Sequence, residues 1–268
     1  MKKANKKVNA ALIIIGNEIL SGRTQDINVI NLSKWLNELG VKVEEIRIVP
    51  DNEIAIVHTV NFLRKRFNYI FTTGGIGPTH DDITSKSIAK AFKLKYGKHK
   101  EAYKLLKNYY GSKNFSMGRK KMAMMPVKAS LILNPSSGAP GFIVDNVYCL
   151  PGVPSILKSM LGELNNKIKG GKKILSRTVS VQTVESEIAK SLENVQLKFK
   201  KVDIGSYPFF RLGKIGVSIV VRSSDKKKIN DCHKEIVSFL KKKKINMKML
   251  RSEVILFLNK EKQVFQLL

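Results

Sequence analysis

Two adjacent aspartates beside a glycine-rich turn are the residues whose types and spacing most directly indicate chemistry. They are Asp81 and Asp82, near the end of the stretch TTGGIGPTHDDIT at residues 72–84, just before a predicted helix. Glycine-rich backbone after a strand lets a phosphate approach closely, and the N-terminus of the next helix favours its negative charge. Two carboxylates would repel that phosphate unless a divalent cation lay between them. The stretch therefore predicts a metal–phosphate site in which Asp81 and Asp82 are the metal ligands.

The same residues have a second interpretation, in which Asp82 only caps the N-terminus of the following helix and needs no metal. Local chemistry favours neither interpretation over the other. The common nucleotide fingerprints are excluded, because His80 stands where G-x-G-x-x-G ends in glycine. No G-x-x-x-x-G-K-[ST] sequence occurs in the 268 residues. The predicted site is therefore neither a standard Rossmann site nor a Walker site.

An alternation of apolar strands and amphipathic helices must position this stretch. The predicted elements are strands at residues 10–15, 41–48 and 69–73, and helices at residues 26–39, 51–67 and after 84. Asp51 is the expected N-cap of the second helix. This β-α-β-α-β-loop-α order favours a mostly parallel sheet covered by helices on both faces.

The carboxyl ends of the predicted strands indicate where a ligand would bind, because ligands in such folds lie at that rim of the sheet. Gly16, Asn17 and Glu18 follow the first predicted strand, and the glycine-rich stretch follows the third. We therefore expect both segments at one rim, where Glu18 would come close to Asp81 and Asp82.

The second half of the chain changes its pattern after a predicted linker at Gly170 and Gly171. Before the linker, residues 98–125 indicate further helix, residues 142–150 a hairpin, and residues 155–168 another helix. After it, short strand-like and helix-like segments alternate and indicate a small α+β unit. The predicted parts are an α/β domain at residues 1–169, a small α+β domain at residues 172–250 and a C-terminal tail at residues 251–268.

Charge and cysteine usage narrow the class of protein. The formal net charge is +28, but only nine of the 49 basic residues are arginine, the usual reader of phosphates and base edges, so a nucleic-acid partner is not favoured. Cys149 and Cys232 lie far apart and outside any Cys/His cluster, which argues against a structural zinc site or a disulfide framework. No apolar run approaches the roughly 20 residues that span a bilayer. We expect a cytoplasmic protein in a reducing compartment.

Four motifs stand in the same order as in a known family. They are GNEILSG with Asp26 and Asn28 after it, TTGGIGPTHDDIT, the loop NPSSGAPGF from Asn134, and the turn LPGVP at residues 150–154. They resemble the motifs of the molybdopterin-binding-like (MoaB/Mog) domain superfamily, in the branch of the CinA N-terminal domain, and are similar to the N-terminal domain of eukaryotic FAD synthase. Residues 185–222 also resemble the small α+β module that follows in CinA proteins.

The resemblance implies a three-layer α/β fold and a metal-dependent nucleotide pyrophosphatase that acts on ADP-ribose or FAD-like dinucleotides. It implies a divalent metal (Mg, Mn or Co) on Asp81 and Asp82, with Asp82, Asp81 and Glu18 as catalytic residues. Glu18 or Asp26 would complete the metal shell or act as base, and His80 is a weaker candidate for metal or phosphate contact. The substrate-binding residues that the motifs imply are Gly16, Asn28, Thr73, Gly74, Gly75, Gly77, Thr79, Gly138, Pro140 and Gly152.

Two alternatives to this assignment remain open from the sequence. The domain could hold molybdopterin or a related phosphorylated cofactor without hydrolysing it, and a basic, nucleic-acid-associated protein ranks third. Gly138 and Pro140 could also serve only to shape the fold, as turn residues commonly do. Because relatives commonly self-associate, the resemblance implies a homo-oligomer. The expected partners are a small nucleotide or pterin ligand and other copies of the chain, with no membrane.

Overall fold

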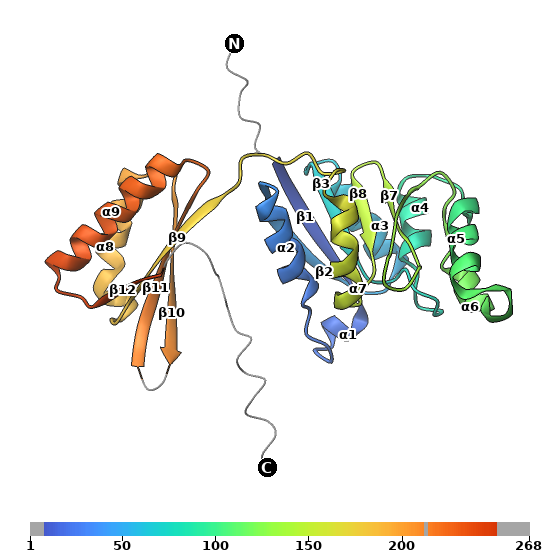
Figure 1. The fold of residues 1–268 in the computed structure, drawn as a ribbon, viewed down its shortest axis with the longest axis horizontal. Coiled ribbons are helices and arrows are strands. Elements are labelled where there is room, and N and C mark those ends of the chain that lie inside the picture. The colour runs from blue at the N-terminus through green and yellow to red at the C-terminus, as the bar shows by residue number, and fades with distance from the viewer. Residues whose placement is uncertain (1–7, 212–213, 251–268) are drawn as a thin grey trace, which may run out of the picture. The chain divides into compact units, whose positions relative to one another are not determined.

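The computed structural model describes residues 8–211 and 214–250 of the chain. The chain divides into two compact units, residues 1–173 and 174–268 (Figure 1). The glycine-rich stretch belongs to the first unit, and each unit has a hydrophobic core of its own.

A six-stranded sheet forms the centre of the first unit. Its strands, in spatial order, are β2 (Val41–Val49), β1 (Val8–Ile15), β3 (Tyr69–Thr73), β8 (Val147–Leu150), β7 (Gly141–Val144) and β6 (Ser130–Ile132). The pairs β2–β1, β1–β3 and β3–β8 are parallel, whereas β8–β7 and β7–β6 are antiparallel. The predicted mostly parallel sheet and the predicted hairpin at residues 142–150 are confirmed.

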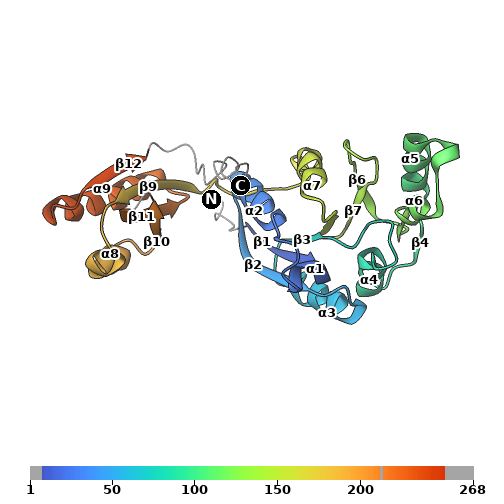
Figure 2. The same ribbon diagram turned by 90° about the horizontal axis from the view of Figure 1, so that it is seen from below.

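Helices cover both faces of this sheet, which gives the three predicted layers (Figure 2). The helices of the unit are α1 (Asn17–Leu20), α2 (Asn28–Glu38), α3 (Glu53–Leu63), α4 (Thr84–Ala91), α5 (Lys100–Tyr110), α6 (Met117–Lys121) and α7 (Pro154–Met160). Successive residues of a strand point to opposite faces. Accordingly, Ile13 of β1 shares one core with Ile88 of α4, and Leu12 shares the other with Leu36 of α2. Both faces of β1 are thus buried, which explains its continuous apolar run.

Residues 98–125 differ from the predicted helix. β4 (Tyr96–Lys98) and β5 (Met124–Pro126) form a two-stranded antiparallel ladder, with α5 and α6 between them along the chain. His99 separates β4 from α5, and its Nδ1 accepts a hydrogen bond from the N–H of Ala102 as the helix N-cap. The prediction was wrong here because a strand of three residues is too short to show a period of two.

Asp51 is not the N-cap of α3, contrary to the sequence-based prediction. Asn52 takes that position, and its Oδ1 accepts a hydrogen bond from the N–H of Ala55 at 3.1 Å. Oδ2 of Asp51 instead accepts from the N–H of Asn17 at 2.8 Å, which ties the end of β2 to the segment after β1. Asp and Asn are both good capping residues, so their order along the chain could not decide between them. The helix predicted at residues 155–168 is also shorter, because α7 gives way to a 3₁₀ turn at Leu161–Leu164.

The second unit is a small antiparallel sheet with two helices. Its elements are β9 (Leu175–Val181), α8 (Glu185–Lys198), β10 (Asp203–Arg211), β11 (Lys214–Ser223), α9 (Lys226–Lys242) and β12 (Met247–Leu250). The strand order is β10-β11-β9-β12, and Ile188 of α8 and Ile236 of α9 share one core with Val179 of β9. The predicted second α+β domain is confirmed, and the predicted tail at residues 251–268 lies outside the described residues. No described helix has the length and apolar character that crossing a membrane requires.

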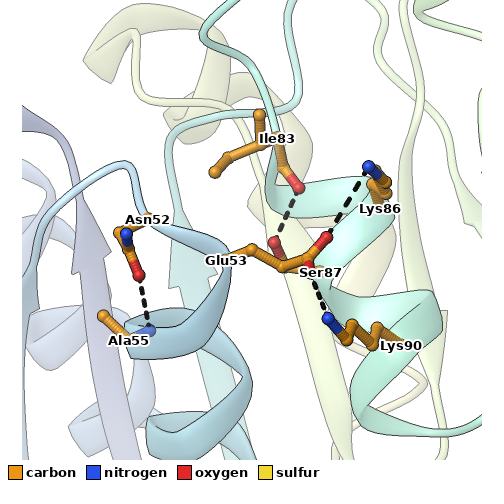
Figure 3. Close-up of polar contacts among 7 residues, drawn as sticks. All are labelled: Asn52, Glu53, Ala55, Ile83, Lys86, Ser87 and Lys90. Atoms are coloured by element: carbon orange, nitrogen blue, oxygen red, sulfur yellow. Dashed lines mark hydrogen bonds and ion pairs between the residues drawn. The ribbon is translucent and has the colours of Figure 1, made fainter.

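Charged residues join α3 to α4 (Figure 3). The carboxylate of Glu53, in the first turn of α3, pairs with the ammonium groups of Lys90 and, at 3.7 Å, of Lys86 on α4. The hydrogen bond from Lys90 and the charges of both lysines lower the pKa of the Glu53 carboxyl from its ordinary value of 4.5, against a smaller opposing effect of burial. The ionised form of Glu53 is therefore the form that makes this contact between the two helices.

We predict that Glu53 stabilises the chain only where it is ionised. A lowered folded-state pKa gives a stabilisation that is present above the ordinary value of 4.5 and is lost as pH falls through the folded-state pKa. The Glu53→Gln variant should therefore unfold at lower denaturant than the wild type at neutral pH, and the difference should vanish in acid. Glu101→Gln, in the first turn of α5, is the matched control. An equal pH dependence of the two variants would contradict the prediction.

Candidate functional site

A turn of two glycines in the left-handed region begins the candidate site directly after β3. Gly74 has φ 98° and Gly75 φ 66°, a conformation that favours glycine. A Cβ atom on Gly74 would lie 2.2 Å from the carbonyl oxygen of Ile15, and one on Gly75 would lie 2.2 Å from Oγ1 of Thr84. Thr84 in turn donates its hydroxyl hydrogen to the Gly74 carbonyl at 2.9 Å. The turn is thus pressed between the end of β1 and the start of α4.

Asp82 shapes the loop between this turn and α4. Its Oδ2 accepts hydrogen bonds from the backbone N–H of Thr79, at 2.7 Å, and from the Thr79 hydroxyl. A Cβ atom on Gly77 would lie 2.7 Å from the same oxygen, so the loop closes tightly around the carboxylate. The N-cap residue of α4 is Ile83, with no side-chain cap, so the simple capping interpretation of Asp82 is wrong.

Asp81 differs from Asp82 in being fully open to solvent. The nearby Thr79 hydroxyl and its own backbone N–H lower the pKa of the Asp81 carboxyl, and the charges of His80 and Lys121 act in the same direction. Asp81 is therefore ionised at neutral pH and carries its charge on the outside of the loop. The exposed ring of His80 lies beside it in the chain.

Lys121 is a residue of this region that the sequence-based analysis missed. It ends α6, and its Nζ donates a hydrogen bond to the Thr79 carbonyl. The two preceding basic residues are engaged elsewhere, since Arg119 lies 4.1 Å over the Tyr110 ring and Lys120 lies 5.8 Å over the Phe115 ring. No sequence signal could have found Lys121, because the contact joins residues 42 positions apart.

The residues after β1 do not join the two aspartates in one acidic cluster. A Cβ atom on Gly16 would lie 2.5 Å from Oε1 of Glu18, so the exposed Glu18 side chain folds back over Gly16. Oδ1 of Asp26 accepts from the N–H of Val29 at 2.8 Å and supports the first turn of α2. Among the described residues, no three His, Cys, Asp or Glu side chains gather as a metal site would require.

Asn28 and Gly152 join each other next to the glycine turn, which Thr73 directly precedes. Asn28 is buried at the start of α2 and donates from Nδ2 to the Gly152 carbonyl at 2.7 Å. A Cβ atom on Gly152 would lie 3.4 Å from the Cα of Gly74. Oδ1 of Asn28 and Oγ1 of Thr73 are buried and have no hydrogen-bond partner among the described residues. Buried polar atoms normally have a partner, so the hydrogen-bonding capacity of these two is unsatisfied in the ligand-free chain.

The loop at residues 134–141 is held by α5 instead. The hydroxyls of Tyr109 and Tyr110 donate to the carbonyls of Ser136 and Ser137 at 3.2 Å and 3.1 Å. Gly138 has φ 71°, and a Cβ atom on it would lie 2.4 Å from the Tyr109 ring. Pro140, the last residue carried over from this motif, is buried. These contacts give the loop a structural role, and none of them reaches Asp81 or Asp82.

We predict that Gly74→Ala destabilises the first unit more than Gly22→Ala. Both glycines have a positive φ, but a Cβ atom on Gly22 would meet nothing within 4 Å. Gly22→Ala should cost about 1–2 kcal/mol, the ordinary strain of a left-handed residue. Gly74→Ala should cost more, because the Ile15 carbonyl must also move. Denaturant unfolding of both variants tests this, and equal losses would contradict the geometry.

Comparisons with known proteins place the chain in a family. Residues 11–169 match the family described as the probable molybdopterin binding domain, and residues 173–248 match the middle domain of FAD synthase. Because the first match spans more than half of the chain, the protein belongs to the molybdopterin-binding domain family. The wider group to which the chain belongs is the MoaB/Mog and CinA-like superfamily.

Individual relatives agree with this assignment. A protein of Archaeoglobus fulgidus is 34% identical over 233 residues, which cover 87% of this chain and 98% of the relative. A CinA-like protein of Sulfurihydrogenibium sp. is 37% identical over 161 residues, or 57% of this chain and 40% of that protein. The crystal structure of the protein CinA of unknown function from Thermoplasma acidophilum superposes with a TM-score of 0.56 at 31% identity, covering 61% of this chain and 99% of the other.

Proposed function

We propose that the first unit is a metal-dependent nucleotide pyrophosphatase, which hydrolyses the diphosphate bond of ADP-ribose or an FAD-like dinucleotide. The observation that carries this proposal is the pair of adjacent carboxylates beside the glycine turn. Asp82 is held in the loop by Thr79, and Asp81 projects from it as an ionised group. The match of residues 173–248 to the middle domain of FAD synthase supports a dinucleotide of the flavin or adenine type.

The carboxylate pair fits a magnesium-type ion better than a closed protein site. Mg²⁺ is commonly bound by one or two carboxylates together with phosphate oxygens of the substrate. Asp81 and Asp82 supply this number, and no third acidic or histidine side chain gathers with them among the described residues. A Mg, Mn or Co ion on Asp81 and Asp82 would neutralise the diphosphate and lower the pKa of a bound water.

The other residues bind and orient the dinucleotide. Gly74, Gly75 and Gly77 carry the loop that leads to the start of α4, where free backbone N–H groups would meet the diphosphate. Lys121 brings a positive charge to the same loop and would exchange the Thr79 carbonyl for a phosphate oxygen. Oδ1 of Asn28 and Oγ1 of Thr73 would satisfy their missing hydrogen bonds with polar groups of the ligand.

We predict that removing one negative charge at the carboxylate pair abolishes turnover without unfolding the chain. Asp81→Asn and Asp82→Asn keep the shape of the side chains, and each should lower metal-dependent AMP release from ADP-ribose or FAD on the order of 100-fold or more. Asp145→Asn, in an exposed hairpin turn where asparagine tolerates the positive φ, is the matched control. If the folded wild-type protein releases no AMP with Mg, Mn or Co, the pyrophosphatase proposal is contradicted.

A second candidate function is binding of molybdopterin or a related phosphorylated cofactor without hydrolysis. Oδ1 of Asn28 and Oγ1 of Thr73 favour this candidate. These buried atoms lack hydrogen-bond partners, which a bound ligand could supply without any reaction. Pterin fluorescence that accompanies the purified protein, and that survives in Asp81→Asn, would support this candidate over the pyrophosphatase.

We also predict that Lys121 contributes to substrate affinity. Loss of one charged hydrogen bond is worth about 1.5–3 kcal/mol, so Lys121→Met should raise the KM for ADP-ribose by about 10-fold or more. Lys120→Met removes the same charge from the neighbouring position, where the side chain lies over Phe115, and should have little effect. If both variants weaken binding equally, the effect comes from net charge and not from the position of Lys121.

A further inference from the structure

Strand β2 forms one edge of the six-stranded sheet of the first unit. β2 has nine residues and β1 as its neighbour in the sheet, whereas β6 at the opposite edge has three residues. A long edge strand exposes a row of unpaired N–H and C=O groups, and proteins usually protect such edges or use them for pairing. The very short β6 fits protection, whereas β2 is long and has only a bulge and charged side chains as protective features.

The backbone of Ile46 and Ile48 faces away from the sheet. The Val49 carbonyl accepts a hydrogen bond from Gly16 at 3.2 Å, so the polar groups of Val49 point towards β1. Polar backbone groups alternate in direction along a parallel strand. Those of Glu45 and Arg47 therefore also point towards β1, and those of Ile46 and Ile48 point outwards. The side chains of both isoleucines are close to half exposed, at 44% and 46%.

The side chains of Glu45 and Arg47 lie on the opposite face of β2 from these isoleucines. Glu45 and Arg47 form an ion pair at 2.6 Å, and the Arg47 guanidinium lies 4.4 Å from the centre of the Phe62 ring of α3. Along β2, the negative Glu45 therefore precedes Ile46 and the positive Arg47 follows it.

We infer that β2 pairs antiparallel with β2 of a second copy of this chain, about a two-fold axis at Ile46. In this register the outward N–H and C=O groups of Ile46 meet those of Ile46 in the second copy. Glu45 of each copy then lies opposite Arg47 of the other, so two cross-strand ion pairs form. The six-stranded sheets of two copies join into one continuous sheet, and the interface is isologous.

Charge complementarity is what selects a second copy as the occupant of this edge. A register centred on Glu45 would place two glutamates opposite each other, and one centred on Arg47 would place two arginines opposite each other. Like charges in directly opposite positions are destabilising. The ladder with β1 also shifts by one residue between Val43 and Glu45, which leaves Glu44 as a bulge. The bulge limits pairing to the half of β2 that contains Ile46.

Charge-reversal variants test this interface. In a homodimer of either variant, Glu45→Arg or Arg47→Glu, position 45 of one copy and position 47 of the other would carry like charges. Sedimentation equilibrium should show a dimer for the wild type and a monomer for each variant alone. An equimolar mixture of the two variants should recover the dimer, because both cross-strand pairs are then of opposite charge. The ion pair within each chain is absent in both variants, so recovery reports the contact between copies.

A second pair of variants controls for folding and for general surface effects. Ile46→Lys places two positive charges on the two-fold axis and should give a monomer. Ile54→Lys makes the same change at a more exposed isoleucine of α3 and should remain dimeric. Circular dichroism must show all variants folded. A monomeric wild type, variants that stay dimeric alone, or a mixture that stays monomeric would each overturn the inference.

Discussion

The close packing of backbone around the glycine turn is the constraint on which the candidate site depends. Gly74 touches the last residue of β1, Gly75 touches the first residue of α4, and Gly152 after β8 lies against Gly74. Segments from β1, the loop before α4 and the turn after β8 therefore meet at one point, with only the Thr84 side chain between Gly75 and α4. Any Cβ atom at Gly74 or Gly75 would push these segments apart and move Asp81 and Asp82 with them.

The strands and the glycine turn could be predicted from the sequence because their signals are local. Continuous β-branched runs mark β1 and β3, and the spacing of glycine and proline marks the turn. The contacts that complete the site are not local. Lys121 reaches Thr79 from another helix, and Asn28 reaches Gly152 across 124 positions. The family motifs identify Asn28 as a polar residue of the first motif. Its hydrogen-bond partner, Gly152, can be identified only from the structure.

The prediction that Glu18 approaches the aspartates shows where topology alone is insufficient. β1 and β3 are neighbours and end at the same rim, so the two segments do begin side by side. Glu18 then turns back over Gly16, while Asp82 turns back towards Thr79. The direction of a side chain depends on the turn that carries it, and a short turn such as α1 has no periodic signal from which to predict that direction.

Tyr109 and Tyr110 hold the loop at residues 134–141 through backbone carbonyls, and this has a consequence for how the protein can change in evolution. A hydroxyl that donates to a carbonyl is indifferent to the side chain on the accepting residue. Ser136 contributes only its carbonyl and N–H, so its side chain is free to vary without loosening the loop. Ser137 is less free, because its hydroxyl accepts from Asn134 at 2.7 Å. Variation between relatives is thus expected at the first of two adjacent serines and restricted at the second.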